Sequence, residues 1–374
     1  MRVAIVSHYY EPHTGGVETV VRAHAQWLMK NGCEVLIVTS QLDGDDEVEF
    51  RDGVEVRRVR ALNTLEEKLG VPVPLVSREL ERTVEDWRPE VVVAHGHAYI
   101  TSWRACRAAR RLQVPFVVVQ HNPFVEYPQP LETVEHVVDA TLGRKVLHAA
   151  DIVVCVSRHV ASYVHSIAPG ASTVVVHNGV DVSRFEPEDS RSGSQKPAGR
   201  ALRVGTLRRL VPRQGLDVLI AAWRAEELGE LGELVIGGSG AMRAELEELA
   251  DGDESITFLG RIEDADLVAF YQSCDVFVLP TTSGEGFGLV AAEALACGVP
   301  VVTTDEGGAR EVVRDGVDGV HVRAKDASSI AMGLRRLLTD NDERIRMAAA
   351  AQKRTLSWED RCEELLEVLR YVKS

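Results

Sequence analysis

Residues 3–40, VAIVSHYYEPHTGGVETVVRAHAQWLMKNGCEVLIVTS, contain the pattern that decides the fold. Two short apolar runs rich in β-branched residues, at 3–7 and 34–40, enclose a helical stripe. That stripe repeats at i, i+3, i+4 and i+7 from Val17 to Leu28 and ends before Asn31. A strand that is apolar along its whole length is typical of a parallel sheet buried on both faces. The stretch therefore predicts a β-α-β unit of a doubly wound sheet.

The same alternation recurs along the chain, and one stretch interrupts it. Residues 186–200, EPEDSRSGSQKPAGR, have no apolar periodicity and are rich in Ser, Gly, Pro and charge, which predicts a linker. Apolar runs that predict further strands before the linker lie at 54–60, 91–95, 115–121, 152–157 and 173–177. Those that follow it lie at 202–206, 233–236, 256–259, 275–280, 300–304 and 319–322.

These patterns predict an α/β protein of two Rossmann-like domains, residues 1–185 and 201–356, joined by the linker at 186–200. A length of 374 residues agrees, because one hydrophobic core rarely serves so long a chain. We expect the two sheets to face each other across a cleft, which is the natural ligand site. The last helical pattern, 357–374, has two open placements: it closes the second domain, or it packs back onto the first.

Charge and cysteine usage limit the partners and the compartment. The chain has 57 acidic and 42 basic residues, a formal charge of −15, which argues against nucleic acid. Residues 1–200 carry 22 basic and 26 acidic residues, so any peripheral membrane contact is expected through the N-terminal domain. Three arginines, Arg104, Arg107 and Arg111, lie on one expected helical face. A solvated face is the default interpretation for them, and contact with a lipid headgroup or an acceptor anion is the alternative.

Six scattered cysteines lack metal-ligand spacing and indicate buried thiols in a reducing cytosol. No apolar run approaches the ~20 residues that span a bilayer. We therefore expect a cytoplasmic protein, with the inner face of the membrane as the alternative location.

Two glycine-rich junctions each lie between an expected apolar strand and the start of an expected helix. They are GGVE at 15–18 and SGEGFGL at 283–289. Backbone N–H groups beside glycine can approach a ligand closely, and a helix N-terminus adds about half a positive charge, so both junctions suit a phosphate. Neither is a GxGxxG or Walker motif, so neither specifically indicates a dinucleotide or a nucleoside triphosphate. Glu285 and Glu293 are suited to accept paired hydrogen bonds from vicinal hydroxyls.

A set of motifs in one order gives the chain a family resemblance. They are GGVE at 15–18, HNGVD at 177–181, RLVPRQG at 209–215, the pair Glu285 and Glu293, and EGGARE at 306–311. Together they resemble the retaining glycosyltransferases of family four, which have the GT-B fold of two Rossmann-like domains. The resemblance runs from residue 3 to about 320.

The resemblance implies same-face transfer of a hexosyl unit from a nucleotide-diphospho-sugar. The donor would be of the GDP-mannose, UDP-glucose or UDP-N-acetylglucosamine type. The acceptor would be a hydroxyl of a small molecule, a lipid-linked sugar or a glycan in glycolipid, polysaccharide or natural-product biosynthesis. It implies no metal ion and no other cofactor.

The resemblance also implies roles for individual residues. The catalytic set is His121 near the transferred sugar, Glu285 on the donor sugar and Arg209 on the diphosphate. Glu293 would hold the ribose hydroxyls. The full donor-binding set is Gly15, Gly16, Arg213, Gln214, Gly286, Phe287, Gly288, Leu289 and Glu293. Candidate acceptor contacts are His95, His97 and Asn122.

One position departs from the family pattern. Gln214 stands where the family usually has Lys, and a Gln cannot neutralise the charge of a diphosphate. We expect Arg213 to supply the missing charge, with Arg208 as the alternative. The departure keeps a non-catalytic nucleotide-sugar-binding protein as a rival function, and a GT-B epimerase is a second one.

Overall fold

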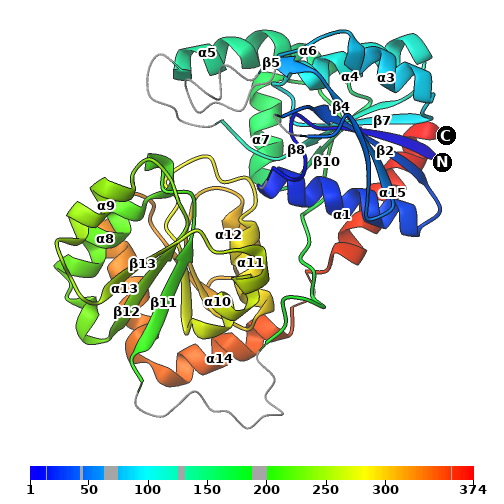
Figure 1. Ribbon diagram of the computed structural model, residues 1–374. Helices are drawn as coiled ribbons and strands as arrows, with labels where there is room; N and C mark the ends of the chain where they lie inside the picture. Colours follow the sequence, from blue (N-terminus) through cyan, green and yellow to red (C-terminus); the bar gives the residue numbers. More distant parts are fainter. Residues whose placement is uncertain (14, 43–44, 63–74, 125–130, 188–199, 355) are drawn as a thin grey trace. The chain divides into compact units, whose positions relative to one another are not determined.

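The computed structural model describes residues 1–374 except 14, 43–44, 63–74, 125–130, 188–199 and 355, so most of the expected linker lies outside the described residues. The chain divides into two compact units. The first unit consists of Met1–Asn178 and Trp358–Ser374, and the second unit of Gly179–Ser357. Each is a parallel sheet with helices on both faces (Figure 1).

The first unit has an eight-stranded sheet in the order β10-β9-β8-β7-β1-β2-β4-β3. Only the edge pair β3–β4 of this sheet is antiparallel. The strands are β1 (Arg2–Val6), β2 (Glu34–Ser40), β3 (Val48–Arg51), β4 (Val54–Val59), β7 (Val91–His95), β8 (Phe116–Gln120), β9 (Ile152–Cys155) and β10 (Thr173–Val175). A separate two-stranded ladder joins β5 (Ala61–Leu62) and β6 (Leu75–Val76).

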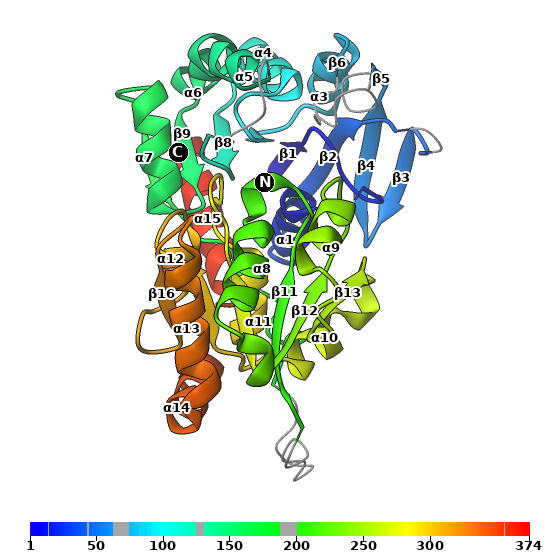
Figure 2. The same ribbon diagram turned by 90° about the vertical axis from the view of Figure 1, so that its left-hand side faces the viewer.

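Helices α1 and α15 cover one face of this sheet, and α3 and α4 cover the other (Figures 1 and 2). Glu81 of α3 is fully buried and pairs with the arginines of α4 that were candidates for a membrane contact, at 2.7, 3.2 and 2.7 Å from Arg104, Arg107 and Arg111. The helices are α1 (Gly16–Lys30), α3 (Glu79–Trp87), α4 (Ile100–Leu112), α5 (Leu131–Val138), α6 (Arg144–Ala149), α7 (Arg158–Ile167) and α15 (Trp358–Lys373), with a π-helix at Asp139–Gly143.

The second unit has a six-stranded parallel sheet in the order β13-β12-β11-β14-β15-β16. Its strands are β11 (Leu202–Leu207), β12 (Gly232–Gly237), β13 (Ile256–Gly260), β14 (Val276–Leu279), β15 (Val301–Thr304) and β16 (Gly319–Val322). Its helices are α8 (Leu216–Ala225), α9 (Arg243–Ala250), α10 (Leu267–Ser273), α11 (Leu289–Ala296), α12 (Ala309–Val312), α13 (Ala327–Thr339) and α14 (Asn341–Gln352), with short 3₁₀ turns at Pro212–Gln214, Leu228–Glu230 and Asp264–Asp266.

Helices α8, α9 and α13 lie on one face of this sheet and α10, α11 and α12 on the other (Figure 1). The core under α8 and α13 contains fully buried large side chains, among them Trp223 and Leu334. Burial of a Leu-sized side chain stabilises a fold by about 1.5–3 kcal/mol, so this layer fixes the sheet on which the site is built.

The boundary between the units falls at Asn178/Gly179 rather than at residue 185. The N–H of Val180 donates to the carbonyl of Leu356, and Phe185 packs edge-on against Tyr271, so residues 179–185 group with the second unit. Of the two placements left open for the last helix, α15 takes the one on the first unit. Its apolar stripe, including Cys362 and Leu369, is buried, and the helix packs on α1.

Each sheet reverses its strand order beside its first strand. β1 pairs with β2 on one side and with β7 on the other, and β11 pairs with β12 and β14 in the same way. Ligands of doubly wound folds bind outside the carboxyl ends of the strands at such reversals. The sites therefore belong to the loops that follow β1, β7 and β8 in the first unit and β11, β14 and β15 in the second.

Candidate functional site

Buried histidines line the carboxyl ends of strands in the first unit. His95 ends β7 and His121 directly follows β8, and their side chains meet at 2.9 Å between Nδ1 of His95 and Nε2 of His121. Burial lowers the pKa of His121 to about 3 and that of His24, on α1, to about 3. Burial also holds the pKa of His95 well below its ordinary value. These imidazoles are therefore neutral near pH 7, and the hydrogen bond between His95 and His121 adds no charge to the site.

The hydrogen bond between Nδ1 of His95 and Nε2 of His121 contains one proton, so one of these nitrogens donates and the other accepts. Nε2 of His95 is buried and has no hydrogen-bond partner. A buried N–H without a partner is rarer than a buried acceptor without one, so we infer that the proton of His95 is on Nδ1. His95 then donates to Nε2 of His121, and His121 carries its own proton on Nδ1. This leaves an N–H donor of His121 for a ligand.

His97 and Asn122, two of the candidate acceptor contacts, lie in different surroundings. Both ring nitrogens of His97 are occupied, Nδ1 by Oε1 of Gln120 at 2.9 Å and Nε2 by Oδ1 of Asp139 at 2.8 Å. Gly143 lies against this ring, because a Cβ there would come within 2.6 Å of Cδ2 of His97. His97 would have to release a partner to bind an acceptor, whereas the exposed Asn122 would not.

The glycine-rich loop after β1 is arranged around a buried carboxylate. Gly15 is extended and is the N-cap of α1, so the N-cap residue itself has no side chain to accept from the first N–H groups of this helix. A Cβ at Gly15 would come within 2.5 Å of Oε2 of Glu18, so the glycine makes room for Glu18 to fold back. Oε1 of Glu18 lies 2.9 Å from Nδ1 of His13. Gly15 and Gly16 are exposed, so the backbone at the start of α1 is accessible to an anion.

Three loops of the second unit pack against one another in backbone contact. A Cβ at Gly308 would lie 1.8 Å from the carbonyl oxygen of Gly286, and one at Gly215 would lie 2.0 Å from that of Pro280. The N–H of Gly308 donates to the carbonyl of Glu285 at 2.9 Å. The loops after β11, β14 and β15 therefore form one assembly that only glycine permits, and this is the physical reason for the glycines in three of the motifs.

Glu285 and Glu293, the two candidate carboxylates of the second unit, have different partners. Oε2 of Glu285 lies 2.8 Å from Nη2 of Arg208, in an ion pair whose side chains are 16% and 7% exposed. Oε2 of Glu293, on α11, accepts a hydrogen bond of 2.6 Å from the hydroxyl of Tyr271. Burial raises the pKa of Glu293 to about 7, and the hydrogen bond from Tyr271 and the charge of Arg184 oppose that rise.

The remaining expected donor contacts lie around this assembly. Arg209 is exposed and Arg213 is half-buried, with its carbonyl accepting from the N–H of Thr282 at 3.0 Å. Gln214 is buried, and its Oε1 has no hydrogen-bond partner. Phe287 and Gly288 are buried, and Gly288, at φ +88°, allows α11 to begin at Leu289.

Sequence patterns underrated two residues of this site. Arg208 entered only as an alternative source of charge, and Tyr271 lies in none of the motifs that the sequence analysis singled out. Both are identified by a partner far away in the chain, Glu285 and Glu293, and short-range periodicity contains no signal for such pairs.

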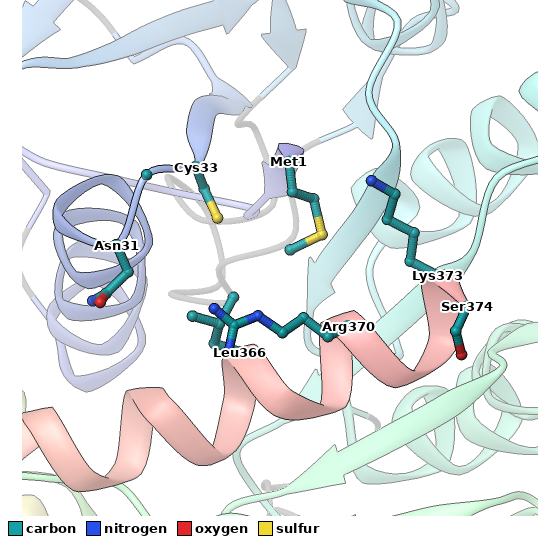
Figure 3. Close-up of a pocket in the computed structure, with 8 residues that line it drawn as sticks. Met1, Asn31, Cys33, Leu366, Arg370, Lys373 and Ser374 are labelled. Carbon is teal, nitrogen blue, oxygen red and sulfur yellow. The ribbon is translucent and has the colours of Figure 1, made fainter.

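A cavity of about 310 Å³ in the first unit lies away from this chemistry. It lies between the α1–β2 turn and the end of α15, and Cys33, Leu366, Arg370 and Lys373 are among the residues that line it (Figure 3). Met1 and Cys33 precede β1 and β2, so the cavity is at the amino ends of the strands, opposite the histidines.

Two features are absent from the described part of the chain. No three His, Cys, Asp or Glu side chains there are grouped so that they could hold a metal ion. None of the helices there is long and apolar enough to cross a membrane.

Comparisons with known proteins match this architecture over the whole chain. The model of "Glycosyltransferase Family 4" matches residues 14–184, and that of "Glycosyl transferases group 1" matches residues 189–354. A GDP-mannose-dependent alpha-(1-6)-phosphatidylinositol monomannoside mannosyltransferase of Mycolicibacterium smegmatis is 30% identical over 98% of this chain and 97% of its own. A D-inositol 3-phosphate glycosyltransferase of Thermobifida fusca is 31% identical over 99% and 93%.

Among solved structures, sucrose-phosphate synthase from Thermosynechococcus elongatus has a TM-score of 0.80 at 22% identity and covers 99% of this chain and 98% of its own. The two doubly wound units and the solved structure define the GT-B fold, and the family models and relatives define a glycosyltransferase. More narrowly, the chain belongs to glycosyltransferase family 4.

Proposed function

We propose that this glycosyltransferase transfers a hexosyl unit from a nucleotide-diphospho-sugar to a hydroxyl acceptor with retention of anomeric configuration and without a metal ion. The observation that carries the proposal is the loop assembly of the second unit. There Glu285, held by Arg208, stands just before the N-terminus of α11, and Glu293 follows on the same helix. A nucleotide-sugar needs those features in that order. Glu285 can accept hydrogen bonds from the sugar hydroxyls, the N–H groups of α11 can donate to the diphosphate, and Glu293 can accept from the ribose hydroxyls.

In this proposal the second unit binds the donor. Glu293 accepts hydrogen bonds from the ribose hydroxyls, and the first N–H groups of α11, at Gly288 and Leu289, hold the diphosphate. Glu285 accepts hydrogen bonds from hydroxyls of the transferred sugar. Arg209 and Arg213 add positive charge at the rim of the site, which stabilises the leaving diphosphate electrostatically.

The first unit supplies the acceptor side of the reaction. The acceptor oxygen forms a bond to the anomeric carbon on the face from which the diphosphate leaves. The bond from that carbon to the phosphate oxygen breaks, and its electron pair stays on the oxygen. The acceptor proton passes to the same leaving oxygen, so no protein base is needed. His121, neutral and with its N–H free, donates a hydrogen bond to a sugar hydroxyl.

The named relatives support a choice among substrates. One is GDP-mannose-dependent and acts on a phosphatidylinositol mannoside, and the other acts on an inositol phosphate. We therefore place GDP-mannose first among the donors and a polyol or lipid-linked polyol first among the acceptors. The reaction would take place in the cytoplasm, with at most peripheral contact at the inner face of the membrane.

A thermal-shift panel of UDP, GDP, ADP and dTDP tests the proposal. A nucleotide present at about 100 times its Kd should raise the free energy of unfolding by about 2.7 kcal/mol. Incubation with the matching nucleotide-sugar and a polyol acceptor should then release free nucleotide, and NMR of the product should show the donor's anomeric configuration. EDTA should not change the rate.

Three outcomes would contradict the proposal or one part of it. Absence of a shift with every nucleotide would remove the donor site. A shift without nucleotide release, with every acceptor tried, would favour the non-catalytic binding protein, for which the neutral, buried Gln214 is the supporting observation. An inverted product would contradict retention alone.

A further inference from the structure

Arg208 has a backbone position that the neighbouring loop fixes. It directly follows β11, and its N–H donates to the carbonyl of Gly237 at 3.0 Å. A Cβ at Gly238 would lie 1.8 Å from the carbonyl oxygen of Arg208, and one at Gly240 would lie 2.4 Å from that of Leu210. The turn after β12 therefore packs in backbone contact with residues 208–210, which leaves little freedom in where the side chain of Arg208 starts.

The side chain of Arg208 is buried in the loop assembly and does not extend into solvent. It is 7% exposed, and its Nη2 lies 2.9 Å from Oγ1 of Thr281 and 2.8 Å from Oε2 of Glu285. A guanidinium has five N–H donors in a planar fork, and these two contacts use the two on Nη2. Three donors of Arg208 are left, and they lie beside Glu285, the residue that the proposed function assigns to the donor sugar.

The charges around Gln214 make this arginine distinctive. Gln214 is buried and neutral, and Arg209 is exposed. In the described part of the chain, Arg208 is the one cation that pairs with Glu285. Burying a guanidinium costs free energy unless its hydrogen bonds are made. If the site needed Glu285 only in its neutral form, it would not need Arg208 as an ion-pair partner.

We propose that Arg208 is a catalytic residue of the donor site and supplies the positive charge that Gln214 lacks. The inference rests on the proposed function, because it names the group that faces the leaving diphosphate. When the bond from the anomeric carbon to the phosphate oxygen breaks, the electron pair on that oxygen adds negative charge to the diphosphate. The free donors of Arg208 bind that charge, while its pair with Glu285 keeps the guanidinium beside the sugar.

The test compares Arg208→Gln with the double variant Arg208→Gln/Gln214→Lys. The first keeps a hydrogen-bond donor for Glu285 and Thr281 but removes the charge, and it should lower kcat by about 100-fold. It should also remove the preference for a nucleoside diphosphate over its monophosphate, measured by calorimetry with the pairs GDP/GMP and UDP/UMP. The double variant returns a cation to the loop assembly. Relative to Arg208→Gln, it should raise both kcat and the preference for the diphosphate by about tenfold.

Arg203→Gln is the matched control, because Arg203 lies near the other end of β11 and pairs with Glu233 at 2.6 Å. This control should keep the wild-type rate. Arg208→Lys keeps the charge and should lose less than Arg208→Gln. It also serves as the test if the thermal melt shows that the Gln variant is unfolded.

The outcomes separate the inference from the function on which it rests. Wild-type turnover in Arg208→Gln would overturn the role of Arg208 and leave the glycosyltransferase intact. A loss of activity that Gln214→Lys does not reverse, with the diphosphate preference unchanged, would make Arg208 a structural support of Glu285 and overturn the inference. If the wild-type chain bound neither GDP nor UDP, the proposed function itself would fail.

Discussion

The carboxyl edges of the two sheets share one topology and differ in their chemistry. In the first unit the strands end in neutral, buried imidazoles, those of His95 and His121. In the second unit the equivalent edge has an ion pair, Arg208 with Glu285, and a carboxylic group, Glu293, that titrates near pH 7. A hydroxyl acceptor needs hydrogen bonds and little charge, whereas a diphosphate donor needs fixed positive charge. Under the proposed function, the difference teaches that one fold is adapted to two kinds of ligand through the residues at its strand ends.

The two edges also differ in how their residues are held. The histidines of the first unit are positioned by side-chain contacts, one ring against another at 5.0 Å between centroids. The loops of the second unit are positioned by backbone contact at glycines such as Gly215 and Gly308. Side-chain changes should therefore damage the first edge, and added side-chain atoms should damage the second.

The charged edge should give the largest loss when Glu285 is removed. Glu285→Ala takes away the sugar contact and also leaves Arg208 buried without its partner, so kcat should fall by about 1,000-fold or more. Steady-state kinetics with the donor identified by the nucleotide panel would measure it. Glu285→Gln should lose less, because it keeps one acceptor for the sugar. Wild-type turnover in Glu285→Ala would show that the carboxylates of the second unit are not part of the donor site.

The backbone packing of that edge should break with Gly308→Ala. A methyl group 1.8 Å from the carbonyl of Gly286 cannot be accommodated without moving the loop, so the free energy of unfolding should fall by about 3 kcal/mol. The matched control is Gly316→Ala, at φ +69° with no atom within 4 Å, which should cost only about 1 kcal/mol of backbone strain. Equal losses in urea unfolding would mean that the loop assembly is softer than its contacts indicate.

The neutral edge should respond to His95→Phe through His121. The substitution removes the donor to Nε2 of His121, so kcat should fall by about 10–100-fold while the Kd of the free nucleotide stays the same. Nitrogen NMR should find the His121 proton on Nδ1 in the wild-type chain and a mixture of tautomers in the variant. A proton on Nε2 in the wild-type chain would contradict the assignment.

The pH dependence of donor binding sharpens the comparison further, because the pKa of Glu293 in the second edge lies near 7, whereas burial lowers the pKa of His95 and His121 in the first. Glu293 accepts hydrogen bonds from ribose best when it is ionised, so nucleotide affinity should fall by up to about tenfold per pH unit below about 7. Tyr271→Phe removes a hydrogen bond that lowers the pKa of Glu293, so it should move the midpoint to higher pH. Affinity without pH dependence between 5.5 and 8, measured by calorimetry, would remove Glu293 from the ribose site.

The raised pKa of Glu293 makes stability change with pH in the direction opposite to nucleotide affinity. The pKa of Glu293 in the folded chain lies above its ordinary value of 4.5, so the folded state binds the proton more tightly than the unfolded state. Its contribution to the free energy of unfolding is therefore complete below pH 4.5 and is lost as the pH rises to about 7. Glu293→Gln should remove this part of the pH dependence, which thermal melts would measure.

Much of this molecule could be predicted from its sequence. The strands at 3–7 and 202–206 were found because buried parallel strands are continuously apolar, and both lie where β1 and β11 are. The edge strand β3 was missed, because Val48 and Phe50 are exposed and give no continuous apolar run. The glycine motifs indicated phosphate-binding loops but not which loops touch one another.

The sequence by itself determined the two-unit α/β architecture, the glycine-rich junctions at the strand ends and the family, since apolar periodicity and glycine positions are local properties of the chain. The tertiary structure decided which side chains act together. Arg208 and Glu285 are 77 residues apart, and His95 and His121 are 26 apart. Their pairing depends on which strands become neighbours in the sheet and on how closely the loops at the strand ends can approach. These are consequences of packing, so local periodicity could not reveal them.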